Sequence, residues 1–173
     1  MHRLPCSMSA SATPAVALAQ GHHVHVHHVH VSRVIAACRR PDEASALAQL
    51  QQQHGSRLHL QQLDTLDDSS IQRAAAQLSS NLSHLDLLLN VSGILHNSSG
   101  LAPETSITRV QRDNLLLSLG TNAIGPILVC QALLPLISRA AQHGATEEQP
   151  AVIANFSARV RAAGKAGWLA ACR

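Results

Sequence analysis

A histidine-rich tract, residues 21–31, is the first stretch whose side chains could do chemistry. It reads GHHVHVHHVHV, six histidines and four valines after a glycine. In an extended chain alternate residues share a face, so His23, His25 and His27 would lie together. Imidazoles at that spacing can chelate Zn, Cu or Ni, but no cysteine or carboxylate stands nearby to complete a chosen geometry. A low-complexity segment in the place of a lost helix explains the tract better than a metal site.

A second group of polar residues stands where short apolar runs stop. The runs cover residues 34–37, 58–60, 85–89 and 151–156, and the polar residues and the glycine that follow them are Arg39, Asp64, Asn90, Ser92, Gly93 and Ser157. Helical patterns separate the runs, at residues 41–54, 67–82 and 106–140, with expected breaks at Gly120 and at Gly125–Pro126. Strands that alternate with helices predict an α/β fold with a parallel sheet and ligands at the carboxyl ends of its strands.

Composition narrows the function classes. The chain has 173 residues, of which 46% are hydrophobic and 13% charged, and these values are typical of a soluble globular domain. Tyrosine is absent, so no mechanism in this chain can use a phenol. The formal charge of +3 is scattered, which argues against a nucleic-acid partner, and no run of 18 apolar residues predicts a membrane span. Four cysteines without a CxxC pair give no support to a zinc ribbon.

Composition and the pattern of apolar runs divide the chain into three segments. Residues 1–14 are expected to be a disordered extension, residues 15–160 a single domain, and residues 161–173 a tail outside it. The Ser- and Ala-rich start is faintly similar to an organellar transit peptide or a signal peptide, while AVALAQG can instead be the first strand of the sheet. A cytoplasmic location is expected, with an organellar one as the alternative.

Five motifs in order carry a resemblance to the short-chain dehydrogenase/reductase family, and in particular to its sniffer-like and C-factor-like carbonyl reductases. They are VIAACRRPDEA at 34–44, LDTLDD at 63–68, LDLLLNVSGIL at 85–95, TNAIGPILVCQALLPL at 121–136 and VIANFSARV at 152–160. The resemblance implies a Rossmann-like sheet, a nicotinamide dinucleotide as cofactor, and a small-molecule carbonyl or alcohol as substrate.

The resemblance also assigns roles in cofactor binding. Arg39 matches the basic residue beside the adenosine 2′-phosphate, which favours NADP over NAD. Asp64 matches the acidic residue that meets the adenine ring. Asn90, Ser92 and Gly93 match the family's NNAG turn with two substitutions; there the glycine admits the cofactor and the asparagine steadies neighbouring strands.

Two further residues match catalytic positions. Asn122 matches the asparagine at a helix kink whose main-chain carbonyl holds a water of the proton relay. Ser157 matches the serine that hydrogen-bonds the substrate carbonyl, although many members place this serine one residue later, where this chain has Ala158.

The chain departs from the family at two places. The family's general acid is a tyrosine with a lysine four residues on, and this chain has no tyrosine and leaves Lys165 without that partner. Gly21 matches the first glycine of the phosphate-binding turn, but the other glycines are absent. Twelve residues, 22–33, then separate Gly21 from Val34, which barely allows a crossover between parallel strands.

These departures set the expected fold and function. We expect an incomplete Rossmann-like sheet of about five strands with its first βα unit disrupted. The expected function is an NADP(H)-dependent carbonyl reductase or alcohol dehydrogenase that is truncated and inactive in this form. The alternative is a non-catalytic binding module or pseudo-enzyme, with the histidine tract as its metal site, and homo-oligomerisation is left open.

Overall fold

The computed structural model describes residues 16–20, 24–25, 28–29, 33–95, 106–143, 145, 147 and 150–156, with side chains from Arg33 onward. A five-stranded sheet has the order β5-β4-β1-β6-β7. Its strands are β1 (Val16–Gln20), β4 (Arg33–Cys38), β5 (Leu58–Gln62), β6 (Leu87–Asn90) and β7 (Val152–Asn155). The helices are α1 (Ser45–His54), α2 (Asp68–Asn81), α3 (Arg112–Leu119) and α4 (Gly125–Ser138). The α/β fold and its flanking helices are therefore as the sequence predicts.

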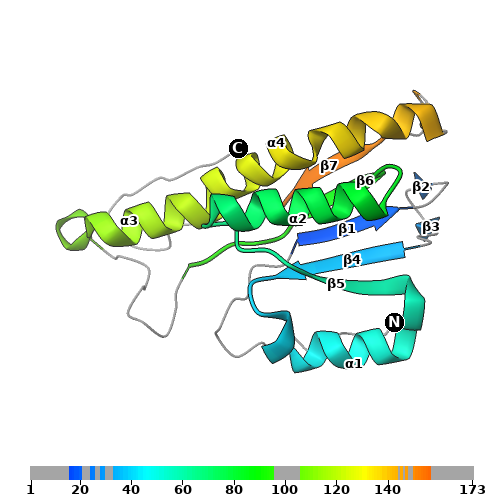
Figure 1. Cartoon of the computed structure of the whole chain (residues 1–173). Helices are drawn as coiled ribbons and strands as arrows, with labels where there is room; N and C mark the ends of the chain where they lie inside the picture. The colour runs from blue at the N-terminus through cyan, green and yellow to red at the C-terminus, as the bar shows by residue number, and fades with distance from the viewer. Residues whose placement is uncertain are drawn as a thin grey trace.

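The direction of β1 departs from the expected parallel sheet. The pairs β4–β5 and β6–β7 are parallel, whereas β1 runs antiparallel to both β4 and β6. In Figure 1 the arrowheads of β1 and β4 point in opposite directions. Val16 lies opposite Ala37 and Asn90, near the carboxyl ends of β4 and β6, and Gln20 lies opposite Arg33 at the start of β4.

The short connection between β1 and β4 gives the physical reason. Antiparallel neighbours can be joined by a hairpin, whereas parallel neighbours need a crossover of a dozen residues or more. Two short strands, β2 (Val24–His25) and β3 (His28–Val29), pair antiparallel within this connection. Strand pairing thus replaces a helix after β1, as expected for a disrupted first βα unit.

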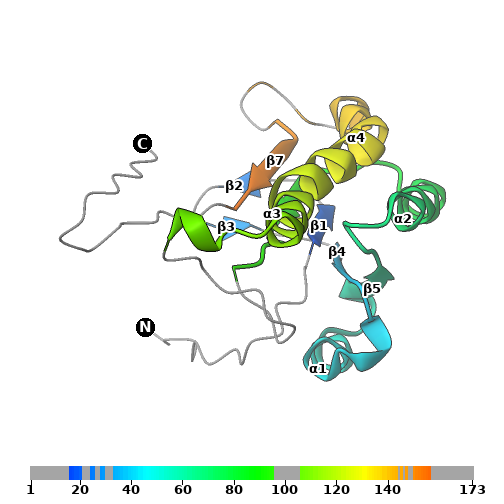
Figure 2. The same cartoon turned by 90° about the vertical axis from the view of Figure 1, so that its left-hand side faces the viewer.

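The hydrophobic core lies between the sheet and two helices. Figures 1 and 2 place α2 and α4 together on one face of the sheet, while α1 lies on the other side beside β5. Fully buried side chains from β6, α2 and α4 meet between them, among them Leu88, Ile71 and Leu133. Apolar positions at helical spacing on α2 account for its packing, because they form one continuous face.

A single helical stretch carries the chain from α3 into α4. Gly120–Ile124 form a π-helical turn between them, so the break expected at Gly120 is a change of helical pitch. α4 then begins at Gly125, with Pro126 in its first turn, where proline is tolerated. A Cβ at Gly125 would lie 2.7 Å from both Cβ and the backbone oxygen of Thr65, so only glycine lets α4 approach the loop after β5 this closely.

The stretch Arg112–His143 is long and apolar enough to cross a membrane, with a mean hydropathy of 1.6 in its most apolar window. Length and composition alone are weak evidence, because the core helix of a soluble protein passes the same test. Val129, Leu133 and Leu136 of this stretch are buried in the core.

Candidate functional site

The carboxyl ends of β4, β5, β6 and β7 lie at one edge of the sheet. The pairs β4–β5 and β6–β7 are parallel, and β4 and β6 run in the same direction because both are antiparallel to β1 between them. Arg39, Asp64 and Asn90 end or follow three of these strands. A cavity of about 320 Å³ lies at the β6–β7 end of this edge. It is lined by Asn90, Ser92, Asn122, Ala123, Pro126, Ile127, Cys130, Asn155 and Phe156.

Asn90 ties together the elements around this cavity. Its Nδ2 donates to Asn155 Oδ1 at 2.8 Å and to Cys130 Sγ at 3.2 Å. The Asn90 carbonyl accepts from the Phe156 N–H at 2.9 Å. Asn90 therefore links β7 and α4 to β6, and the role in cofactor binding predicted for it stays a prediction.

Two buried oxygens in the cavity wall have no hydrogen-bond partner among the described residues. They are Asn90 Oδ1 and Ser92 Oγ. Asn90 is 2% and Ser92 8% exposed, so water reaches neither side chain freely. A buried polar atom without a partner costs free energy of about 1–3 kcal/mol. The cavity thus offers one acceptor and one hydroxyl to a polar group that enters it.

Asn122 holds the segment after β6 through its side chain. Its Oδ1 accepts from the Ile94 N–H at 2.7 Å, and its Nδ2 donates to the Ile94 carbonyl at 2.9 Å. The amide therefore pairs with a backbone much as a neighbouring strand would. Gly93 lies beside it, and an added Cβ there would be 3.5 Å from Asn122 Oδ1, an ordinary contact. The catalytic role predicted for Asn122 involves its main-chain carbonyl and stays a prediction.

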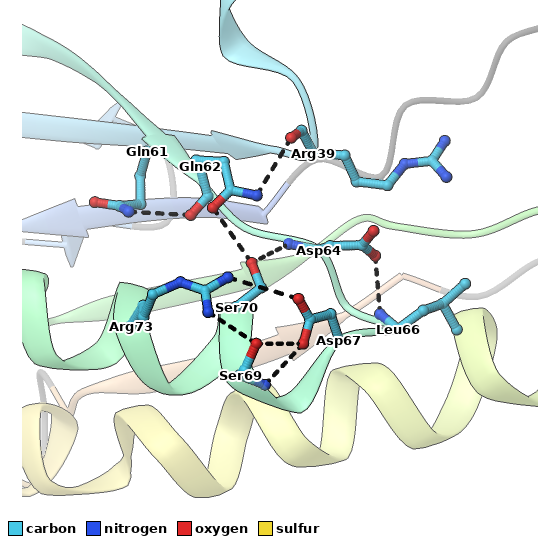
Figure 3. Close-up of polar contacts among 9 residues, drawn as sticks. All are labelled: Arg39, Gln61, Gln62, Asp64, Leu66, Asp67, Ser69, Ser70 and Arg73. Carbon is cyan, nitrogen blue, oxygen red and sulfur yellow. Dashed lines mark hydrogen bonds and ion pairs between the residues drawn. The ribbon is translucent and has the colours of Figure 1, made fainter.

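Arg39 presents a free cation beside the end of β4. Among the described residues its buried Nε–H has no hydrogen-bond partner, and in Figure 3 its guanidinium points away from the other labelled side chains. Its neighbour Arg40 differs, because it is exposed and pairs with Glu43 at 2.9 Å. Among the described residues, Arg39 is thus the arginine at this edge with a buried N–H that has no hydrogen-bond partner.

Asp64 lies in a network of hydrogen bonds that begins α2 (Figure 3). Its Oδ1 accepts from the Leu66 N–H at 2.9 Å, and its own N–H donates to Ser70 Oγ at 3.0 Å. Asp67 caps α2 by accepting from the Ser69 N–H at 2.9 Å. The pKa of Asp67 lies below its usual value, mainly because the Ser69 side chain donates a hydrogen bond to its carboxylate. The backbone N–H groups of Ser70 and Ser69 and the positive charge of Arg73 lower this pKa further.

Two predicted site residues, Gly21 and Ser157, lie outside the described residues. The residue before Gly21, Gln20, ends β1 opposite Arg33, at the amino ends of the parallel strands. Arg39, Asp64 and Asn90 lie at the carboxyl ends. A dinucleotide's phosphates normally bind a helix N-terminus after the first strand at that carboxyl edge. β1 therefore ends at the other edge of the sheet.

Sequence reasoning missed several residues of the cavity wall. Asn122, Pro126 and Cys130 recur every four residues, so one helix face presents all three to the cavity. That spacing is visible in the sequence and would have added Pro126 and Cys130. Asn155 is the last residue of β7 just as Asn90 is the last residue of β6, so the same strand-end argument would have found it.

Within the described part of the chain, no group of three or more His, Cys, Asp or Glu is arranged to hold a metal ion. His84 and His143 stack with ring centroids 4.6 Å apart, and His84 Nε2 lies 3.4 Å from Asp86 Oδ2. His84 precedes β6, so the stacked pair lies at the opposite end of that strand from Asn90, and neither histidine lines the cavity.

Comparison with known proteins gives two kinds of match in sequence. A family model described as "Enoyl-(Acyl carrier protein) reductase" matches residues 22–173. Human retinol dehydrogenase 5 is 36% identical over 110 residues, which are 62% of this chain and 32% of that protein. The mouse protein of the same name is 33% identical over the same length. The chain thus spans about a third of the length of these relatives.

Solved structures agree in fold. An NADPH-bound carbonyl reductase from chicken fatty liver has a TM-score of 0.63 and 32% identity, covering 73% of this chain and 46% of that one. The carbonyl reductase Sniffer of Drosophila melanogaster has a TM-score of 0.62 and 27% identity, covering 73% and 50%.

Proposed function

Because the chain belongs to the short-chain dehydrogenase/reductase family, we propose that it is an NADP(H)-type unit of that family that binds the dinucleotide at the two ends of the site. The observation that carries the proposal is the pair of unpartnered buried oxygens, Asn90 Oδ1 and Ser92 Oγ, in the cavity. The cavity would receive the nicotinamide end and a small carbonyl or alcohol substrate. Bound NADPH would supply a hydride.

The adenosine end of the site is assigned to Arg39 and Asp64. The Arg39 guanidinium is planar and has an unpartnered N–H, which suits the 2′-phosphate that distinguishes NADP from NAD. Asp64 ends the neighbouring loop and keeps one carboxylate oxygen bonded to the Leu66 N–H. The preference for NADP rests on Arg39 in this proposal.

The middle of the site fits the dinucleotide less well. The described residues place no helix N-terminus after β1 at the carboxyl edge, because β1 ends at the opposite edge. We expect the pyrophosphate to be held weakly, and the affinity for the dinucleotide to be low for this reason.

Paired arginine variants test the proposal. Arg39→Ala removes the cation assigned to the 2′-phosphate, and a charge-assisted hydrogen bond is worth about 1.5–3 kcal/mol, or roughly tenfold or more in affinity. Arg40→Ala is the matched control, because it removes an adjacent arginine that is 69% exposed and already paired with Glu43.

Isothermal titration of each variant with 2′-phospho-ADP-ribose gives the readout. Arg39→Ala should weaken binding of this ligand roughly tenfold or more, while Arg40→Ala stays within about twofold of the wild type. An equal loss of affinity in the two variants, or no loss of affinity in Arg39→Ala, would show that Arg39 does not bind the 2′-phosphate.

A further inference from the structure

Cys130 is a thiol in the cavity wall that the proposed function leaves unused. It is partly exposed, and it accepts a hydrogen bond from Asn90 Nδ2 at 3.2 Å. The thiolate is the nucleophilic form of cysteine. Geometry thus provides a nucleophile with access to the cavity.

The second observation is the unpartnered Ser92 Oγ in the same wall. Ser92 is 8% exposed and its hydroxyl has no partner among the described residues, so it can donate to an oxygen that enters the cavity. Pro126, Ile127 and Phe156 add an apolar lining. A ligand that satisfies these groups has an apolar body and one hydrogen-bond-accepting oxygen, placed within reach of a soft nucleophile.

We propose that Cys130 is a covalent binding site for α,β-unsaturated ketones, with Ser92 as the residue that holds the ketone oxygen. Sγ forms a bond to the β-carbon while the C=C electron pair moves to give an enolate. The Ser92 hydroxyl donates to the enolate oxygen. The proton lost by the thiol is returned through water to the α-carbon, so the product is a saturated thioether and no oxidant or reductant is needed.

This inference is independent of dinucleotide binding, because neither the nucleophile nor the hydroxyl donor requires NADP. Cys38 provides an internal reference, since it is fully buried and its burial raises the pKa of its thiol. Cys38 should therefore react slowly with any electrophile that does not unfold the protein.

The test treats the whole chain, without dinucleotide, with oct-1-en-3-one and follows each cysteine by peptide-mapping mass spectrometry. We expect the thioether to form at Cys130 at least about tenfold faster than at Cys38. The rate at Cys130 should saturate with enone concentration, because binding precedes bond formation. The saturated ketone octan-3-one should protect Cys130 from iodoacetamide.

Variants then separate recognition of the ketone from simple thiol exposure. Ser92→Ala should slow the enone about tenfold, as expected for a lost hydrogen bond, and leave the iodoacetamide rate unchanged. Ser80→Ala is the matched control, because its exposed hydroxyl only donates to the Gln77 carbonyl on α2. It should change neither rate.

Three results would overturn the proposal. The first is a rate of thioether formation at Cys130 no faster than that at Cys38. The second is a rate at Cys130 that rises linearly with enone concentration and is not lowered by octan-3-one. The third is a Ser92→Ala variant in which the rates with the enone and with iodoacetamide change equally. The concentration dependence and the protection need no variant, so they decide the matter even where Ser92→Ala fails to fold.

Discussion

At the scale of single residues, buried polar atoms without a hydrogen-bond partner among the described residues indicate the candidate site more clearly than charged side chains do. Arg39 and Arg40 are adjacent and chemically alike, yet one is paired with Glu43 and the other has an unpartnered N–H. Asn90 Nδ2 donates to Asn155 and Cys130, while its Oδ1 has no partner within the part of the chain that the structure describes. Which atoms remain free depends on tertiary neighbours, so the sequence predicted these residues without indicating which of their atoms a ligand would meet.

Asp67 carries a pH-dependent contribution to stability. Hydrogen bonds at the start of α2 depress the pKa of its carboxyl below the usual 3.8. A depressed pKa in the folded state contributes stability that is present above the unfolded value and is lost as pH falls through the folded one. Asp67→Asn keeps a capping oxygen but cannot ionise.

We therefore expect Asp67→Asn to unfold at lower urea concentration than the wild type near neutral pH, and this difference to disappear as the pH falls through the lowered pKa of the Asp67 carboxyl. Urea unfolding across that range measures it. A gap that stays constant down to low pH would show that the charge of Asp67 contributes nothing.

At the scale of elements, the sequence predicted where helices and strands lie better than how they run. β5 and β6 overlap the apolar runs predicted at 58–60 and 85–89, and α2 overlaps the helical pattern predicted at 67–82. AVALAQ became β1, but a strand pattern is the same in either direction, so only the short connection of residues 22–33 hinted at the reversal. The π-helical turn had no signal beyond Gly120 itself.

The contact between α4 and the loop after β5 depends on Gly125. A methyl group there would overlap Thr65 at 2.7 Å from both its Cβ and its backbone oxygen, so α4 must shift. We expect Gly125→Ala to lower the free energy of unfolding by about 1–3 kcal/mol, measured by urea unfolding.

Gly93→Ala is the matched control for this element, since its new Cβ would meet Asn122 Oδ1 at an ordinary 3.5 Å. It should cost less than Gly125→Ala. The reverse order of the two costs would mean that the α4 contact is not tightly packed.

At the scale of the whole molecule, the proposed dinucleotide site has residues at its two ends, whereas β1 between them ends at the opposite edge of the sheet. The parallel pairs β4–β5 and β6–β7 place the residues proposed for the adenosine and nicotinamide ends at one edge, while β1 between them runs the other way. β7 ends the sheet as described, and the unpaired side of an edge strand can pair with another chain. The expected homo-oligomerisation and the cytoplasmic location stay predictions.

Absence of tyrosine carries the prediction for activity. A family reductase needs a phenol as general acid, and general acid catalysis contributes about 10²–10⁴-fold to a rate. We expect this chain to show no saturable oxidation of NADPH with small carbonyl substrates. The assay monitors the loss of NADPH absorbance in the near ultraviolet. Saturable turnover that Ser157→Ala abolishes would contradict this expectation.

Titration of the wild-type chain with NADPH and NADH shows whether the carboxyl edge of the sheet binds NADP(H) through its adenosine and nicotinamide ends. Isothermal titration should give one NADPH per chain, bound weakly but at least about tenfold more tightly than NADH, since the two differ only by the 2′-phosphate assigned to Arg39. Equal affinity for the two dinucleotides, or no binding of NADPH at millimolar concentration, would contradict the account.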